Sequence, residues 1–354
     1  MILVLNCGSQ SIKWKVFALP AVAGYPLGLK GGQDFKVIKE SSVKVLEGDD
    51  YKKILREELS EIKGFRIQSV GHRVVHGKDI FKKPTRITKE NLFELEKLNR
   101  LAPLHNPFNI SGIKICQEIF RNAPQFAVFD TEFFSDLPEK AFTYALPQEI
   151  VRDFSLRRYG FHGISHEYVA KKATEKIKKP FEKLKLITCH LGGGASITAI
   201  KNGKAIDTSM GFTPLEGLVM MTRPGNIDAG IILELAKKYG VEKTNEILNK
   251  ESGLKGICRE SQMLKVLEKI KHGDKSAKLA LDVFVYAIQK YIGAYFATLD
   301  GCDAVVFTGA IGFGSEKIRN MICKDLKILR GVKILAIKTD EELAIAQKIQ
   351  LLAI

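Results

Sequence analysis

The sequence predicts an α/β protein made of two related halves that face a cleft. Its 354 residues are too many for one typical domain and comfortable for two. Short apolar runs typical of strands alternate along the chain with longer stretches of helical periodicity. An internal echo adds a third observation, because a strand, a turn of small residues and a second strand occur around Gly8 and again around Gly192. We therefore expect two halves built alike.

The first half opens with a predicted hairpin over 2–17, in which a small polar turn joins two strand-like segments. A Gly/Pro-rich connector follows at 20–32, and an alternating segment at 35–46 is typical of a strand. Asp49 and Asp50 are suited to cap a helix that runs to residue 63. The remaining expected elements of this half are a strand at 67–75, helices at 88–101 and 107–121, and a strand at 125–129 that ends in Asp130.

The pattern restarts after the chain turns over 145–157 through Pro147. A lysine-rich helical stretch surrounds 171–179, and Asn202-Gly203 is typical of a hairpin turn. The other expected elements are strands at 184–189 and 197–200 around the loop 190–196, helices at 227–239, 242–250, 261–271 and 275–299, a strand at 304–307, a glycine-rich segment at 308–315 that opens a helix, a strand at 332–337 and a helix from 340.

The composition is that of a globular protein, with 45% hydrophobic and 27% charged residues, which excludes a disordered chain. A net charge of +15 raises the alternative of a nucleic-acid binder. The lysines, however, are spread along helical stretches among glutamates, and no run of basic and aromatic residues occurs. We expect a solvated basic surface and no nucleic-acid partner, with a field that helps to gather anionic substrates.

The cysteines and the apolar segments bear on the cellular compartment. Six scattered cysteines form no C-x-x-C pair, which favours free thiols in a reducing environment. No run of eighteen apolar residues occurs, and no leader-like segment precedes the strand-like residues 2–5. These features predict a cytoplasmic protein with no membrane partner.

Three glycine-rich turns are candidate phosphate sites. The turn 6–13 combines small residues, hydroxyls and Lys13, and its backbone N–H groups can face an anion, although its spacing is not that of a Walker A loop. Three consecutive glycines at 192–194 allow very close approach of a ligand to the backbone. Gly309–Gly314 lies between a strand and a helix start. Each turn alone could be an ordinary structural turn, but three in one chain favour phosphate binding.

Two arginines and one aspartate are the candidate charged groups. Arg73 ends a strand beside Val74 and Val75, and Arg223 stands in a turn. The planar guanidinium suits carboxylates and phosphates, so two such groups would serve a site for two anions. Surface ion pairs are the competing interpretation of both arginines. Asp130 directly follows a strand, where carboxylates often meet ligands, although helix capping would also explain it.

Histidines are concentrated in motifs that contain glycine or proline. Of the seven, all except His272 stand in such motifs, namely His72, His76, His105, His162, His166 and His190. No histidine or cysteine spacing matches a zinc site. Hydrogen bonding to phosphate is therefore the better interpretation of these side chains.

Taken together, these motifs resemble the acetate kinase family, within the superfamily of acetate and sugar kinases, heat-shock proteins and actin. The resemblance spans nearly the whole chain, over 6–13, 72–77, 101–107, 128–133, 159–166, 188–198, 208–228 and 341–346. It implies two duplicated actin-like (ribonuclease H-like) domains with a cleft between them. The N-terminal domain would comprise 1–147 and the C-terminal helix 341–354. The second domain, 148–340, would bind the nucleotide and form a homodimer.

The resemblance also implies a role for each matched residue. Arg73 and Arg223 would hold the substrate carboxylate and the migrating phosphoryl group, and His162 would stabilise the transition state with Arg223. Asn6, Asp130 and Glu341 would position Mg²⁺, with Mn²⁺ as an alternative. The acyl pocket would be formed by Val75, Leu104, Phe161 and Pro214. ATP or ADP and their phosphates would be bound by Ser9, Ser11, Lys13, His190, Gly192, Gly193, Gly194, Gly309 and Gly312, with His105 in support.

The implied reaction is reversible, Mg²⁺-dependent, direct in-line transfer from ATP to acetate, giving acetyl phosphate and ADP. Departures from the family pattern lie on the nucleotide side, at Gly193, Phe313 and Gly314, and the span 315–339 is shorter than usual. Pyrophosphate therefore stays open as a donor. Propionate or butyrate stays open as an acceptor, although Val75 favours acetate. A sugar or polyol kinase and a non-catalytic nucleotide-binding protein are the rival interpretations. The sequence sets neither the physiological direction nor the oligomeric state.

Overall fold

The structure, a computed structural model, describes residues 1–9, 11–19, 35–46, 48–103 and 105–352. The expected connector at 20–32 and Leu104 of the expected acyl pocket lie outside these residues. The chain forms two compact units, Met1–Glu132 with Asp340–Ile354, and Phe133–Thr339. The domain limits expected from the sequence, 1–147 and 148–340, stay a prediction.

The first unit contains a six-stranded mixed sheet. Its strands are β1 (Ile2–Cys7), β2 (Ser11–Ala18), β3 (Lys36–Lys44), β4 (Ser69–Val74), β5 (Thr85–Arg86) and β6 (Gln125–Phe129). They lie in the order β3-β2-β1-β4-β6-β5, and the first three strands form an antiparallel meander. β1, β4 and β6 run parallel, so their carboxyl ends meet at one edge of the sheet. That edge is where Asn6, Arg73 and Asp130 stand.

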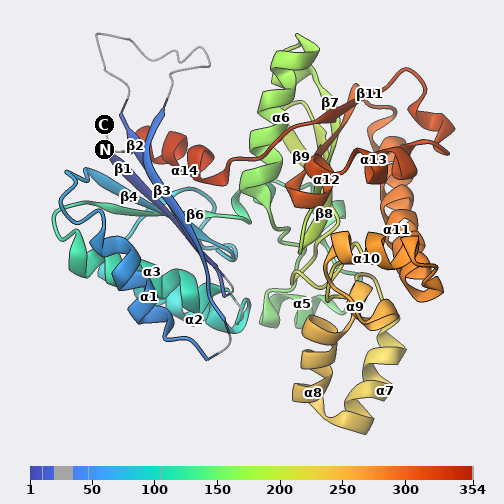
Figure 1. Ribbon diagram of the computed structural model, residues 1–354, viewed down its shortest axis with the longest axis horizontal. Helices are drawn as coiled ribbons and strands as arrows, with labels where there is room; N and C mark the ends of the chain where they lie inside the picture. The colour runs from blue at the N-terminus through green and yellow to red at the C-terminus, as the bar shows by residue number, and fades with distance from the viewer. Residues whose placement is uncertain (10, 20–34, 47, 104, 353–354) are drawn as a thin grey trace. The chain divides into compact units, whose positions relative to one another are not determined.

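Helices cover both faces of this sheet (Figure 1). One face is covered by the helices α1 (Tyr51–Ser60), α2 (Lys89–Lys97) and α3 (Asn106–Ile119). The other face is covered by α14 (Glu341–Gln350), which packs on β1 and β4. The expected cap of α1 is confirmed, since the Asp50 carboxylate accepts a hydrogen bond from the Lys53 amide. α14 lies so close to β4 that a Cβ atom on Gly71 would lie 2.6 Å from Ile345 Cγ2.

The second unit repeats this sheet pattern. β7 (Lys185–Leu191), β8 (Ala195–Lys201) and β9 (Lys204–Thr208) form an antiparallel meander, and β10 (Ala304–Thr308) and β11 (Lys333–Ala336) extend it in parallel from β7. The order β9-β8-β7-β10-β11 is that of β3-β2-β1-β4-β6 in the first unit. The expectation of two halves built alike is thereby confirmed.

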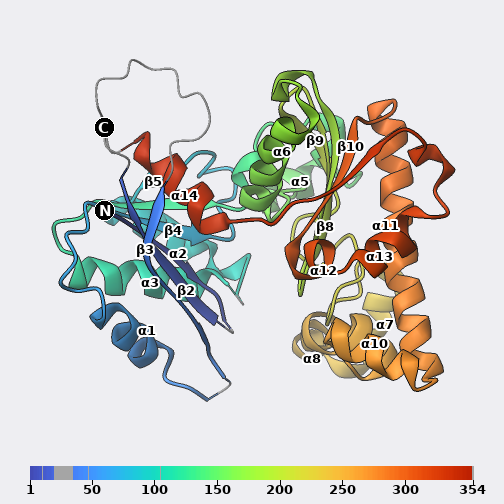
Figure 2. The same ribbon diagram turned by 45° about the horizontal axis from the view of Figure 1, so that its top comes forward.

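Two long helices sandwich the second sheet. α6 (Gly163–Ile177) packs on β7 and β10, with Leu186 and Val306 in the core beneath it. α11 (Lys275–Leu299) packs on β7 and β8 from the other face (Figure 2). Successive strand residues point to opposite faces, which is why strands covered on both faces are mostly apolar, although Thr188 in β7 and Ser196 in β8 are buried polar residues. Within the described residues, no helix is both long and apolar enough to cross a bilayer.

The remaining helices lie mostly where periodicity placed them. They are α4 (Glu139–Phe142), α5 (Gln148–Phe154), α7 (Ala229–Tyr239), α8 (Val241–Glu246) with a π-helical continuation (Ile247–Glu251), α9 (Gly253–Cys258), α10 (Met263–Lys271), α12 (Gly309–Gly314) and α13 (Glu316–Cys323). Single 3₁₀ turns occur at Leu98–Arg100, Glu132–Phe134, Phe181–Lys183 and Lys327–Leu329. The expectation of a mere turn over 145–157 is wrong, because α5 forms there. Pro147 precedes the helix as its N-cap, and α5 buries no side chain that would produce an apolar period.

Candidate active site

In the first unit, Arg73 and Asp130 form the centre of a charged cluster. Arg73 lies at the carboxyl end of β4, and Asp130 directly follows the carboxyl end of the neighbouring parallel strand β6. The Arg73 guanidinium donates to both Asp130 oxygens, from Nε at 3.0 Å and from Nη2 at 2.6 Å. Its Nη1 lies 3.0 Å from Glu341 Oε2 at the start of α14. Asp130 is almost completely buried, so this two-pronged contact fixes the arginine at the edge of the sheet.

Asn6, at the end of β1, completes the cluster. Its amide nitrogen lies 3.4 Å from a carboxylate oxygen of Glu341 and of Glu342, and its amide oxygen lies 3.4 Å from Arg73 Nη1. Burial, together with the charges of Asp130 and Glu342, raises the pKa of Glu341 to about 7 against the opposing effects of Arg73 and Lys13. Three acidic groups thus crowd around one guanidinium.

This donor set fits a hard divalent cation. Mg²⁺ prefers oxygen ligands and usually takes one or two carboxylates, completing its shell with water and substrate phosphates. A cation here would relieve the crowding that raises the pKa of Glu341. Among the described residues, no group of three or more His, Cys, Asp or Glu side chains is placed to hold an ion alone. The cluster therefore suits an ion that arrives with a phosphate-bearing ligand.

A pH dependence of stability follows from the Glu341 carboxyl group. Its folded-state pKa of about 7 lies above its ordinary value of 4.5, so the unfolded chain releases this proton first. In metal-free protein the free energy of unfolding should therefore fall as the pH rises from 4.5 to about 7, by on the order of 1–3 kcal/mol. Urea unfolding in EDTA across this range measures the slope. Glu341→Gln should flatten the curve, and an unchanged slope in that variant would assign the effect to other groups.

The first glycine turn lies beside this cluster. The Gly8 amide donates to the Ser11 carbonyl at 2.9 Å and closes the hairpin, and Ser9 and Ser11 are partly exposed. Lys13 stands opposite Asn6 in the ladder of β1 and β2 and is exposed. Among the described residues it makes no ion pair. Its ammonium group is therefore available to an anion at the same sheet edge.

Two asparagines that the sequence interpretation did not assign hold this edge together. Asn109 accepts a hydrogen bond from the Val75 amide at 3.2 Å and donates to the Cys7 carbonyl at 2.7 Å, so it ties β1 to β4. Asn106 bonds both backbone polar groups of His76. Both are buried on one face of α3. Two asparagines three residues apart among apolar helix positions were the available signal, since a buried amide needs partners.

In the second unit, His162 and Arg223 converge on the three-glycine turn. The turn joins β7 to β8 and closes with a hydrogen bond from the Gly192 amide to the Gly194 carbonyl at 3.0 Å. A Cβ atom on Gly194 would lie 3.1 Å from His162 Cε1 and 3.4 Å from Arg223 Nη2. Bare backbone, an imidazole and a guanidinium thus meet at one point. Gly193 packs beside Met221 and offers no side-chain donor.

His162 is held in an unusual backbone conformation. It has a φ of 59° and stands just before α6, in the left-handed region that costs a non-glycine residue about 1 kcal/mol or more. Its ring stacks on His190 with 4.3 Å between centroids. The His190 Nδ1 atom in turn shares a hydrogen bond of 2.8 Å with the Ser165 hydroxyl. Strain of this kind is maintained where a side chain must occupy one position.

Arg223 differs from Arg73 because no counter-charge pairs with it among the described residues. Its only hydrogen bond among the described residues runs from Nη1 to the Pro214 carbonyl at 2.9 Å, and no carboxylate of those residues pairs with it. Burial lowers the pKa of Arg223 to about 10. A desolvated cation without a partner is unfavourable unless an anionic ligand supplies the missing charge. This side chain is the clearest mark of an anion site in the second unit.

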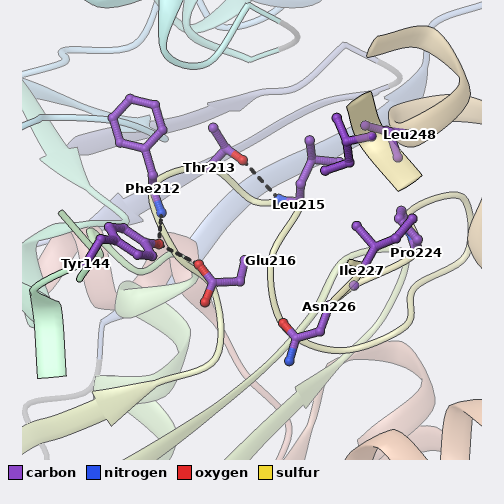
Figure 3. A pocket seen from close by; sticks show the side chains of 11 residues that line it. Tyr144, Phe212, Thr213, Leu215, Glu216, Pro224, Asn226, Ile227 and Leu248 are labelled. Carbon is purple, nitrogen blue, oxygen red and sulfur yellow. Dashed lines mark hydrogen bonds between the residues drawn. The ribbon is translucent and has the colours of Figure 1, made fainter. Parts of the chain in front are cut away.

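The loop that carries Pro214 and Arg223 is held by a separate polar network. Glu216 accepts a hydrogen bond from Tyr144 Oη at 2.5 Å (Figure 3). It accepts a second one from Arg158 Nη2 at 2.6 Å. The loop also lines a cavity of about 470 Å³ with Phe212, Leu215, Ile227 and Leu248 among its walls. Among the described residues, no lysine or arginine lines the cavity, so the described walls lack a cation for an anionic substrate.

Gly309 has a packing reason to be glycine. It has a φ of 76°, and a Cβ atom there would lie 2.5 Å from the Leu191 carbonyl oxygen. A Cβ atom on Gly312 would make ordinary contacts, 3.4 Å from the Cys189 carbonyl oxygen and from Leu191 Cβ. The first turn of α12 therefore lies directly against the end of β7. Their part in nucleotide binding stays a prediction.

The residues predicted from the sequence form two clusters, one in each unit. The first contains Asn6, Ser9, Ser11, Lys13, Arg73, Val75, Asp130 and Glu341, and the second contains Phe161, His162, His190, Gly192, Gly193, Gly194, Pro214, Arg223, Gly309 and Gly312. Each cluster brings anion-binding groups to the strand ends of an α/β sheet. Two like sheets with these clusters define a two-domain phosphotransferase of the actin-like fold.

The comparison with protein families narrows this class. The model of the acetokinase family matches residues 1–349. The chain belongs to the acetokinase family, whose members are phosphotransferases with a carboxyl group as acceptor.

Individual relatives agree over their full length. The chain is 42% identical to an acetate kinase of Carboxydothermus hydrogenoformans and 43% identical to one of Alkaliphilus metalliredigens, with 98% of each chain covered. Those alignments extend over 388 and 394 positions, so both relatives carry segments that this chain lacks. Its structure matches the crystal structure of a Porphyromonas gingivalis acetate kinase with a TM-score of 0.85 at 33% identity, covering 99% of both chains. A Francisella tularensis propionate kinase gives 0.84 at 37% identity, covering 98% of both.

Proposed function

We propose that this protein is an acetate kinase, which transfers a phosphoryl group reversibly between ATP and acetate. The observation that carries the proposal is Arg223, a desolvated cation that has no counter-charge among the described residues and meets His162 at a glycine turn. Substrate carboxylate and phosphoryl groups supply the missing negative charge. Membership of the acetokinase family and the match with named acetate kinases support the same reaction.

Each cluster takes one part of the task. A carboxylate is already a nucleophile, so no strong base is needed, and the barrier lies in aligning two anions and spreading the phosphoryl charge. Arg73 and Arg223 hold the reacting anions for direct in-line transfer, and His162 donates a hydrogen bond to the migrating group. Asn6, Asp130 and Glu341 hold Mg²⁺, which neutralises phosphate charge when bound. Val75 of the first unit, and Phe161 and Pro214 of the second, are the apolar residues that would contact the acyl methyl group.

The phosphoryl donor is the less constrained half of the proposal. Gly193, Phe313 and Gly314 depart from the family pattern, and Gly193 has no side chain to donate. We nevertheless propose ATP, since Ser9, Ser11, Lys13, His190 and the two glycine turns remain. Pyrophosphate is the alternative that the test below includes.

A coupled assay that varies donor and acceptor tests the proposal. We expect kcat/KM to be highest for ATP with acetate, about tenfold lower for propionate and lower again for butyrate, because one methylene in such a pocket is worth roughly 1–3 kcal/mol. Hexoses and glycerol should give no product. Preference for butyrate would overturn the pocket assignment, and ATP binding without acyl phosphate formation would refute the kinase assignment.

We further propose a homodimer formed through the second unit, acting in a reducing cytoplasm. α7 has no buried residue and exposes Ile231 and Leu233, with Tyr239 at its end. We propose that these exposed apolar side chains contact the partner subunit. All six cysteines are free thiols. Sedimentation velocity that gives a monomer at every concentration would reject the dimer, and cell fractionation tests the compartment.

A further inference from the structure

A chain of three buried side chains leads to the proposed phosphoryl-binding histidine. His162 Nδ1 lies 2.9 Å from the Ser196 hydroxyl oxygen, and the same oxygen lies 2.7 Å from His166 Nε2. His166 Nδ1 lies 2.7 Å from the Thr188 hydroxyl. Ser196, His166 and Thr188 are fully buried, and burial holds the pKa of His166 well below its usual value. His166 is therefore neutral and carries one ring proton.

Thr188, at the far end of this series of hydrogen bonds, determines which atom donates in each bond. Among the described residues, the Thr188 hydroxyl has one hydrogen-bond partner, His166 Nδ1. A buried hydroxyl that only accepted would leave its own proton without an acceptor, which is costly. Thr188 must then donate, so His166 Nδ1 accepts and its proton is on Nε2. That proton goes to the Ser196 oxygen, and the Ser196 proton goes to His162 Nδ1.

We infer that Thr188, His166 and Ser196 are positioning residues that fix neutral His162 as the tautomer with its proton on Nε2. The Nε2 atom is the one that faces the glycine turn, because a Cβ atom on Gly194 would lie 3.2 Å from it. In this tautomer the ring donates a hydrogen bond toward the turn. If every hydrogen bond in the series ran in the opposite direction, a neutral His162 would present the lone pair of Nε2 to the turn and repel a phosphoryl oxygen. The catalytic consequence of this inference rests on the proposed function. The assignment of the tautomer rests on the hydrogen bonds alone.

Imidazole ¹⁵N shifts of the full-length protein labelled at histidine test the tautomer directly. In the wild type, His162 should show a protonated Nε2 and an unprotonated Nδ1, with its signals identified by their loss in His162→Gln. Thr188→Val keeps the shape of the side chain and removes the donor. We expect it to release the tautomers of His166 and His162 and to lower kcat about tenfold, with KM for acetate within about twofold. Thr188→Ser should restore both the shifts and kcat.

Ser196→Ala should act as Thr188→Val does, and it provides a second test if the valine disturbs the fold. Ser209→Ala is the matched control, since Ser209 is an equally buried hydroxyl that accepts from the Ile197 amide outside this chain. It should leave the His162 shifts unchanged and kcat within about twofold. A wild-type His162 protonated on Nδ1, or Thr188→Val with unchanged ring shifts, would overturn the inference. Absence of acetate kinase activity with the expected shifts would instead refute the proposed function alone.

Discussion

Replacing Arg223 with methionine should nearly abolish acetate phosphorylation and at the same time stabilise the protein. The guanidinium has the Pro214 carbonyl as its only hydrogen-bond partner and no carboxylate partner among the described residues. Removal of a group that stabilises developing charge costs about 10³-fold in kcat/KM. Replacement of an uncompensated, desolvated cation with an apolar side chain should gain about 1 kcal/mol, which corresponds to roughly 2–4 °C in Tm for a unit of this size.

Steady-state kinetics and thermal unfolding check both halves of this expectation. Arg158→Met is the matched control for stability, because Arg158 is also partly buried in the second unit but is paired with Glu216 at 2.6 Å. That variant should lower Tm. Acetyl phosphate should raise the Tm of the wild type but not that of Arg223→Met. A methionine variant with wild-type kcat/KM would remove Arg223 from the site, and one as destabilised as Arg158→Met would show that its charge is compensated.

Replacing Arg73 with methionine should have the opposite effect on stability and a similar effect on activity. Arg73 compensates Asp130 and Glu341, so its loss leaves buried carboxylates facing one another. Breaking a buried pair by removing one partner costs about 3–5 kcal/mol. We expect kcat/KM for acetate to fall about 10³-fold, together with a loss of stability that Mg²⁺ partly restores. Urea unfolding with and without Mg²⁺ measures this.

A neutralised cluster separates the two effects of Arg73. In the triple variant Arg73→Met, Asp130→Asn and Glu341→Gln, the repulsion is removed, so stability should recover toward the wild type while activity stays absent. If Arg73→Met alone unfolds at the wild-type urea concentration, the carboxylates are not held by this arginine, and the account of the cluster is wrong.

The placement of Arg73 and Asp130 at the ends of two strands is an example of what the sequence could predict, whereas their pairing was not predicted. Both residues end apolar strand segments, and parallel neighbouring strands bring their ends together. The glycine turns and the repeated strand–turn–strand pattern could be predicted from the sequence because each is a local pattern. Long helices such as α11 followed from periodicity, whereas the short and exposed α5 gave no period to read.

Partners far apart in the chain could not be predicted from local pattern. Glu342 and Lys15 come 3.7 Å apart only because α14 returns to the first sheet. The isolation of Arg223 is likewise invisible in its own neighbourhood, since it depends on which carboxylates the folded chain leaves elsewhere. Asn109 shows the same limit, because its role depends on the ends of two strands that no helical period can locate.

The insertion of the whole second unit between β6 and α14 has a consequence for biosynthesis. A ribosome delivers every strand of the first sheet early, but the helix that covers one of its faces emerges only after some two hundred further residues. Until then Ile345 is absent from its place against Gly71, and Glu341 is absent beside Arg73. One apolar face of the nascent N-terminal sheet therefore stays uncovered until α14 has been synthesised. The enzyme cannot complete its folding in the order in which it is translated.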